Sequence, residues 1–273
     1  MSVLEAISTI KQRLSVRTNV NLVRNLIPVL GVRSATQYVI QSKIRHGGTD
    51  VFQLRPPAAK YPVSVRRGTS DIRVFRQIFI QREYSTIDTL TDVKLVVDCG
   101  ANVGYSSVYF LSRFPQCEVV AVEPDAGNFE MLEANVRAYG QRIRTVRAGI
   151  WSHRADLVIS ERTKGEGDEW GRQVRERGPN EASDAKGMDI PSILALSGHQ
   201  RISILKVDIE GTEGIVFSQN AKPWLDKTDT IVIELHDALT SGKASEAFFD
   251  SIRDQRFEIS RSGELTICRR IER

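Results

Sequence analysis

The chain has 273 residues, of which 41% are hydrophobic and 26% are charged, and its formal net charge is +4. This length can bury a large core, and the composition excludes a disordered chain, a collagen-like fibre and a disulfide-stapled scaffold. The most apolar N-terminal stretch, residues 22–32, is too short and too interrupted to cross a bilayer. The three cysteines are widely spaced and residues 1–20 lack a signal-peptide pattern, so we expect a cytoplasmic protein with reduced thiols.

Positive charge is concentrated in residues 1–48, which form an N-terminal arm. Its lysines and arginines face only one acidic residue, Glu5, so the arm is +6 and the remainder is −2. Apolar residues recur at helical spacing, which predicts helices packed on the body with a basic outer face. A solvated helix face explains such a charge run, and contact with a membrane surface, a protein partner or nucleic acid is the alternative.

Residues 49–93 form a lead-in of two short strands, over 51–54 and 63–66, and a helix over 72–84. From Lys94 onwards, apolar runs of strand length alternate with helical stretches, which indicates a mostly parallel sheet covered on both faces. The strands are expected over 95–97, 119–122, 143–146, 204–209 and 231–235, with helices over 128–139 and 244–253. An antiparallel pair, 257–261 and 264–269, joined by a turn at Ser262-Gly263, closes the edge of this 94–273 domain.

One segment, residues 161–187, is crowded with charged residues and has only two strongly apolar ones, Trp170 and Val174. Such a stretch contributes little core, so we expect a charged surface insertion. It is either a disordered surface segment or an active-site lid. Trp170 slightly favours the lid, because a lone tryptophan in a charged loop often covers a site.

The sharpest local signal is the sequence Val-Val-Asp-Cys-Gly-Ala-Asn-Val-Gly at 96–104. A strand ends in Asp98, a tight turn follows, and a helix begins near Gly104, with its amide groups directed at a ligand. The spacing is G-x-x-x-G, and Asn102 replaces the second glycine of the dinucleotide fingerprint. A carboxylate at 98 repels a phosphate but suits the ammonium of a methionine moiety.

The next strand ends in a second acid, Glu123, 23 residues after Gly100. An acidic residue at that place accepts hydrogen bonds from both hydroxyls of a ribose. The loop and this distal acid together favour S-adenosylmethionine over a nicotinamide dinucleotide.

Two later strand ends, 205–211 and 233–237, carry too many polar groups for a plain core. In a strand, alternate side chains point to the same face, so Asp208 and Glu210 share one face and Glu234 and His236 share one face of the next strand. These groups are expected to have a function; the alternative is that some of them cap helices or pair with Lys206. Methyl transfer to a hydroxyl requires a proton acceptor, for which His236 is the first candidate and Asp208 the second. The group could also hold a divalent cation, although no metal is predicted. The candidate catalytic residues are His236, Asp208, Glu234 and Glu210.

Together these blocks resemble the FkbM family of S-adenosylmethionine-dependent methyltransferases, from about residue 63 to residue 237. The resemblance rests on several blocks of sequence. These are 67–71 with 74–75 and 83–84, then 97–106, 122–125 with 128–129 and 132, 205–211 with Glu213, and 234–236.

The resemblance implies an α/β, class I (Rossmann-like) methyltransferase fold with a mostly parallel seven-stranded sheet, preceded here by a helical and short-strand extension. It also implies O-methylation, often of sugar or polyketide hydroxyls. The segment 161–187 is longer and more polar than the family pattern. The candidate cofactor-binding residues are Asp98, Gly100, Ala101, Asn102, Gly104, Glu123, Pro124, Asp125 and Asn128.

The prediction is therefore an O-methyltransferase that uses S-adenosylmethionine and a sugar, polysaccharide or polyketide-like acceptor. A non-catalytic cofactor-binding protein, docked through its basic arm, is one alternative. A nucleic-acid methyltransferase is another, disfavoured because basic residues are not interleaved with aromatic ones for base stacking. A nicotinamide-dependent dehydrogenase comes last because of the loop spacing.

Overall fold

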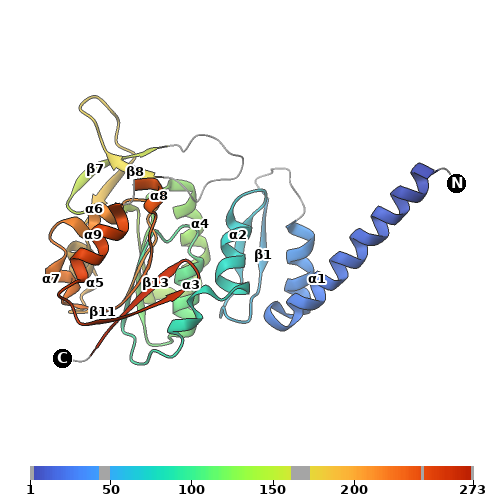
Figure 1. Cartoon of the computed structure of the whole chain (residues 1–273), viewed down its shortest axis with the longest axis horizontal. Coiled ribbons are helices and arrows are strands. Elements are labelled where there is room, and N and C mark those ends of the chain that lie inside the picture. Colours follow the sequence, from blue (N-terminus) through green and yellow to red (C-terminus); the bar gives the residue numbers. More distant parts are fainter. Residues whose placement is uncertain (1–2, 43–49, 161–172, 241–242, 272–273) are drawn as a thin grey trace. The chain divides into compact units, whose positions relative to one another are not determined.

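The computed structural model describes residues 3–42, 50–160, 173–240 and 243–271 (Figure 1). Contacts divide the chain into two compact units, Met1–Arg82 and Glu83–Arg273. Residues 83–93 therefore group with the large sheet, and residues 49–82 group with the N-terminal helix. No helix in the described ranges is both long enough and apolar enough to traverse a lipid bilayer.

The first unit begins with helix α1 (Val3–Gln41), which contains Pro28 and departs from helical geometry at Gly31, where φ is +72°. Proline removes a helix hydrogen bond and glycine tolerates positive φ, so the helix is interrupted there. Its second half buries apolar side chains, and Tyr38 stacks on Phe75 with ring centroids 5.9 Å apart.

The remainder of this unit is a small hairpin followed by a helical segment. Strands β1 (Val51–Leu54) and β2 (Val63–Arg66) pair antiparallel, as predicted. Helix α2 (Asp71–Phe75) continues into a π-helical turn, η1 (Arg76–Ile80). The helix expected over 72–84 therefore ends at Ile80, and a separate 3-10 turn, η2 (Glu83–Ile87), opens the second unit.

The second unit is built on the predicted seven-stranded sheet, whose order is β12-β13-β11-β10-β3-β4-β5. The five strands from β11 to β5 are parallel, and β13 runs antiparallel to both of its neighbours, β11 and β12. The strands are β3 (Leu95–Cys99), β4 (Glu118–Val122), β5 (Ile143–Val146), β10 (Ile202–Val207), β11 (Thr228–Glu234), β12 (Phe257–Ser262) and β13 (Leu265–Arg270).

Helices cover the sheet on both faces, so the central strands are mostly apolar, with Asp98 on β3 and Lys206 on β10 as buried charged exceptions. Residues Ile193, Phe217 and Phe248 from one set of helices pack with strand residues in a single core cluster. These helices are α5 (Ile190–Ser197), α6 (Glu213–Ser218) and α9 (Lys243–Ile252), with the short α7 (Lys222–Leu225) and α8 (Asp237–Thr240) beside them. Helices α3 (Tyr105–Arg113) and α4 (Ala126–Val136) lie on the other side (Figure 1).

A second sheet contains β6 (Ala148–Ile150), β7 (Ala155–Ser160), β8 (Gln173–Glu176) and β9 (Ala185–Met188), in the order β6-β9-β7-β8. The second half of the charged segment 161–187 therefore contributes strand β8 and most of β9 to this sheet, which the sequence did not predict. Val174 is buried against Trp151 and Leu157, while the charged neighbours of Val174 point outward. Residues 161–172, including Trp170, lie outside the described residues.

Candidate active site

The loop after β3 is organised by Asp98, which is completely buried. Its Oδ2 accepts hydrogen bonds from the hydroxyls of Ser106 at 2.7 Å and Ser107 at 2.6 Å, both on α3. Its Oδ1 lies 3.2 Å from the ammonium of Lys206 on β10. Both carboxylate oxygens therefore bind protein groups, so Asp98 joins the loop to the helix and to the next strand.

Two glycines allow this loop to pack closely, and both have positive φ, +76° at Gly100 and +86° at Gly104. A methyl group on Gly100 would overlap the carbonyl oxygen of Asp208, and one on Gly104 would lie 2.7 Å from Leu132 on α4. Asn102, between them, also has positive φ, +51°. The predicted glycine positions are thus required by backbone conformation and by space.

Glu123 follows β4 and turns back onto the loop. Its Oε2 accepts from the backbone amide of Asn102 at 2.9 Å, and its Oε1 accepts from the amide of Asp125 at 3.0 Å. Burial raises the pKa of Glu123 to about 7, although these two amides act in the opposite direction. Each carboxylate oxygen retains acceptor capacity, so the residue can also accept from a diol.

The other predicted cofactor residues cluster in the same two turns. Ala101 is buried in the loop, and its amide donates to the carbonyl of Val122 at the end of β4. Pro124 is half-buried, and Asp125 caps helix α4 by accepting from the amide of Asn128 at 2.9 Å. The turns after β3 and β4 therefore form one hydrogen-bonded structure.

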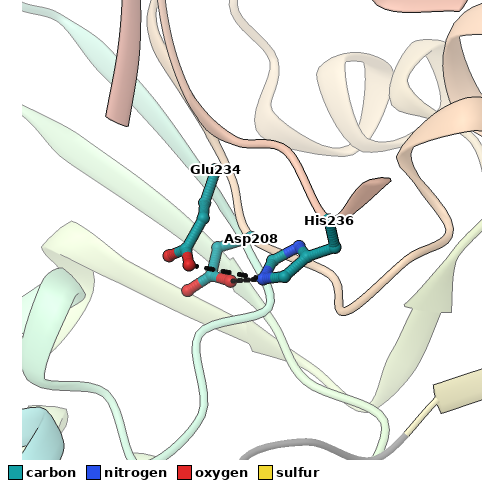
Figure 2. Close-up of side chains that lie close together, drawn as sticks. All are labelled: Asp208, Glu234 and His236. Carbon is teal, nitrogen blue, oxygen red and sulfur yellow. Dashed lines mark ion pairs between the residues drawn. The ribbon is translucent and has the colours of Figure 1, made fainter. Parts of the chain in front are cut away.

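The candidate catalytic residues meet around His236, which follows β11. Its Nδ1 lies 2.7 Å from Oε1 of Glu213 at the start of α6, whose side chain is completely buried. Its Nε2 lies 3.4 Å from Glu234, 3.7 Å from Glu210 and 3.9 Å from Asp208, measured to the nearest carboxylate oxygen. Figure 2 shows Asp208 and Glu234 converging on this nitrogen from neighbouring strands. The structure thus brings all four predicted catalytic residues together.

Charge in this cluster is strongly unbalanced, and the carboxylates and the imidazole respond differently. Burial alone lowers the pKa of His236, but its hydrogen bonds with Glu213 and Glu234 and the charge of Asp208 raise it to about 11. Burial, and then the charge of Asp208, raise the pKa of Glu210 to about 8. At neutral pH, His236 is therefore an imidazolium among acidic groups.

Three residues of this site were not among the sequence candidates. Glu83, on η2, faces the same acids, since burial and the charges of Glu234 and Asp208 raise its pKa to about 7. Glu213 contacts His236 directly, and Lys206 contacts Asp98. Both lie in the polar 205–213 block, where the sequence suggested Lys206 as a partner of these acids and the family resemblance included Glu213, although neither was singled out as a site residue.

One group among the described residues has the spacing to hold a metal ion. Ligand atoms of Asp208, Glu234 and His236 all lie within 4.8 Å of one another (Figure 2). The carboxylate oxygens suit Mg²⁺ or Mn²⁺, and the imidazole suits Zn²⁺ or Fe²⁺. Since His236 already places a positive charge among these acids, part of their negative charge is compensated without an ion.

A doubly covered parallel sheet with an antiparallel strand inserted near one edge, and with acids at the ends of β3 and β4, defines a class I methyltransferase fold. Residues 98–259 match the family model described as the methyltransferase FkbM domain. The chain therefore belongs to the FkbM methyltransferase family.

Several known proteins are similar to this chain. The AMB antimetabolite synthetase AmbE of Pseudomonas aeruginosa is 28% identical, and the match covers 68% of this chain and 10% of AmbE. The chain thus spans about a tenth of that relative. Methyltransferase 1 of Beauveria bassiana is 23% identical, with 70% of this chain and 80% of that protein covered. A putative rRNA-methylase structure from Clostridium thermocellum aligns at 7% identity and a TM-score of 0.45, covering 71% and 96%.

Proposed function

We propose that the protein transfers the methyl group of S-adenosylmethionine to a hydroxyl of a sugar, polysaccharide or polyketide-like acceptor. The observation that carries this proposal is the close packing of Gly100 on the backbone of Asp208. This contact places the candidate cofactor loop directly beside the acidic cluster at the ends of β10 and β11. Membership of a methyltransferase family supports methyl transfer as the chemistry.

The residues at the ends of β3 and β4 fit this cofactor. Glu123 is buried beside the loop and suits the ribose hydroxyls. The turn that contains Pro124, Asp125 and Asn128 would lie next to the bound cofactor. Asp98 acts by holding the loop, since Ser106, Ser107 and Lys206 occupy its oxygens. When bound, S-adenosylmethionine supplies an electrophilic methyl group.

The acidic cluster supplies the acid–base chemistry of the acceptor site. A protonated His236 cannot take a proton, so the raised pKa favours Asp208 or Glu234 as the group that accepts the hydroxyl proton. The imidazolium then donates to acceptor oxygens and holds the carboxylates in place. Glu210, with a pKa near 8, can act as a hydrogen-bond donor in the same site.

Calorimetric titration with S-adenosylhomocysteine and, separately, with NADH tests the cofactor. We expect micromolar binding of S-adenosylhomocysteine that is lost in Glu123→Ala and no heat with NADH. Binding heat with NADH alone would indicate a dehydrogenase-type function. No binding heat with either ligand would favour a non-catalytic protein. Mass spectrometry for a 14 Da gain across panels of glycans, polyketides and oligonucleotides then tests the acceptor class. A gain on oligonucleotides alone would contradict the proposed class.

A further inference from the structure

Lys206 is a buried lysine at the centre of the parallel sheet, with a side chain only 3% exposed. It lies on β10 directly opposite Asp98 of β3 in the strand register. An ammonium removed from water is costly unless charges and hydrogen bonds replace its hydration. The groups around Lys206 therefore show what this residue is there to hold.

Its ammonium donates hydrogen bonds to two carbonyls of the glycine loop. The Nζ atom lies 2.6 Å from the carbonyl oxygen of Gly100 and 3.3 Å from that of Cys99. These carbonyls lie where the chain leaves β3 and reverses, and the same turn presents the Asn102 amide to Glu123. Lys206 thus holds the inner side of the loop whose other side adjoins the candidate cofactor site.

The same ammonium also bridges two acids on different sides of the site. It lies 3.2 Å from Asp98 and 3.6 Å from Asp208, measured to the nearest carboxylate oxygen. Burial alone lowers the pKa of Lys206, but these two carboxylates outweigh it and raise the pKa well above its usual value. The residue is therefore charged at every working pH. The three N–H donors of an ammonium point in tetrahedral directions, so they can serve the loop carbonyls and the two carboxylates better than the coplanar donors of a guanidinium could.

We propose that Lys206 is a positioning residue that holds the glycine loop in its cofactor-binding conformation and fixes Asp208 beside it. This inference rests on the function proposed above. Lys206 does not touch the cofactor; it acts through the carbonyls of Gly100 and Cys99. Its contribution is therefore measured as affinity for S-adenosylhomocysteine, separately from the charge balance that stabilises the fold.

The test compares Lys206→Met, Asp98→Asn and the double variant by calorimetry with S-adenosylhomocysteine and by thermal melting. Methionine keeps the apolar stem but removes the charge and the donors. Asparagine at 98 keeps acceptors for Ser106 and Ser107 but removes the charge that Lys206→Met leaves unpaired. Lys222→Met is the matched control, since Lys222 is 75% exposed and pairs only with Asp226 in the described structure.

We expect Lys206→Met to lose at least tenfold in affinity and to melt at a lower temperature. The double variant should regain most of the melting temperature but not the affinity, because the two loop carbonyls still lack their donor. Recovery of both quantities would show that Lys206 only balances charge and would overturn the proposal. Unchanged affinity in Lys206→Met would also overturn it. If Lys206→Met does not fold, the double variant decides.

If the wild-type protein does not bind S-adenosylhomocysteine, this result would contradict both the proposed function and the inference that rests on it. Wild-type binding together with an unaffected Lys206→Met would leave the proposed function intact and exclude only the role of Lys206. Lys222→Met should bind as the wild type does. Equal losses in Lys222→Met and Lys206→Met would show that any lysine substitution weakens binding, which would overturn the assigned role.

Discussion

His236 and Glu213 form a partly buried pair, with Nδ1 of the imidazole 2.7 Å from Oε1 of the carboxylate, although 23 residues separate them. Glu213 begins helix α6, and His236 follows strand β11. The pair fixes the ring so that Nε2 faces Glu234, Glu210 and Asp208. In the function proposed above, His236 is therefore a fixed cation between acids, and Asp208 or Glu234 accepts the proton.

Replacing His236 by glutamine tests this arrangement. We expect His236→Gln to bind S-adenosylhomocysteine normally but to lose about a hundredfold in single-turnover methyl transfer, a loss typical of acid–base groups. Asp208→Asn should behave in the same way. His199→Gln is the control, since His199 pairs with exposed Glu118 and should keep full turnover. Full turnover in both His236→Gln and Asp208→Asn would contradict the assigned site.

Removing divalent metals from the protein tests the second way in which this cluster could be neutralised. Because the His236 imidazolium already lies among Asp208 and Glu234, we expect turnover to be unchanged after dialysis against EDTA. The measurement is methyl transfer before and after dialysis, and again after Mg²⁺ or Mn²⁺ is added. Activity that disappears and then returns with either ion would identify these residues as metal ligands.

Much of the larger unit could be predicted because its strands are continuous β-branched runs bounded by turn residues. The run at 143–146 coincides with β5, and the predicted antiparallel pair is β12 and β13, although its turn lies at Gly263-Glu264, one residue later than expected, because Ser262 still pairs with Leu265. The glycine loop was equally readable, since positive φ at Gly100 and Gly104 requires that residue type. Local patterns therefore specified the strands of the large sheet and the glycine loop well.

Long-range relationships were not readable in the same way. Lys206 faces Asp98 only because β10 lies beside β3, which depends on a strand order that periodicity does not encode. Strand β8 was missed because it has a single buried apolar residue, Val174, which is followed directly by the charged residues Arg175 and Glu176. The role of His236 as a cation depends on Glu213, whose approach follows from how α6 packs.

The pKa of Glu123, raised by burial from 4.5 to about 7, has two opposite consequences. The folded protein binds the proton more tightly than the unfolded chain does, so this group destabilises the fold as pH rises from about 4.5 to 7. A ribose diol donates to the ionised carboxylate, so affinity for S-adenosylhomocysteine should increase about tenfold from pH 6 to pH 8. Glu123→Gln should bind weakly at both pH values. An equal pH dependence in that variant would assign the effect to another group.

The last prediction compares alanine substitutions at two glycines with almost the same backbone conformation, Gly100 with φ +76° and Gly198 with φ +77°. A methyl group at Gly100 meets the backbone carbonyl of Asp208, which cannot rotate away, whereas one at Gly198 has no atom within 4 Å. Gly198→Ala should therefore cost only backbone strain, about 1 kcal/mol of unfolding free energy.

Gly100→Ala should cost about 3 kcal/mol, from strain and overlap together. Because the loop must move away from β10 to relieve the overlap, Gly100→Ala should also abolish binding of S-adenosylhomocysteine, whereas Gly198→Ala keeps it. Urea unfolding and calorimetry on both variants measure the two effects. Equal destabilisation by the two substitutions, with binding retained in both, would show that the loop does not depend on close packing against Asp208.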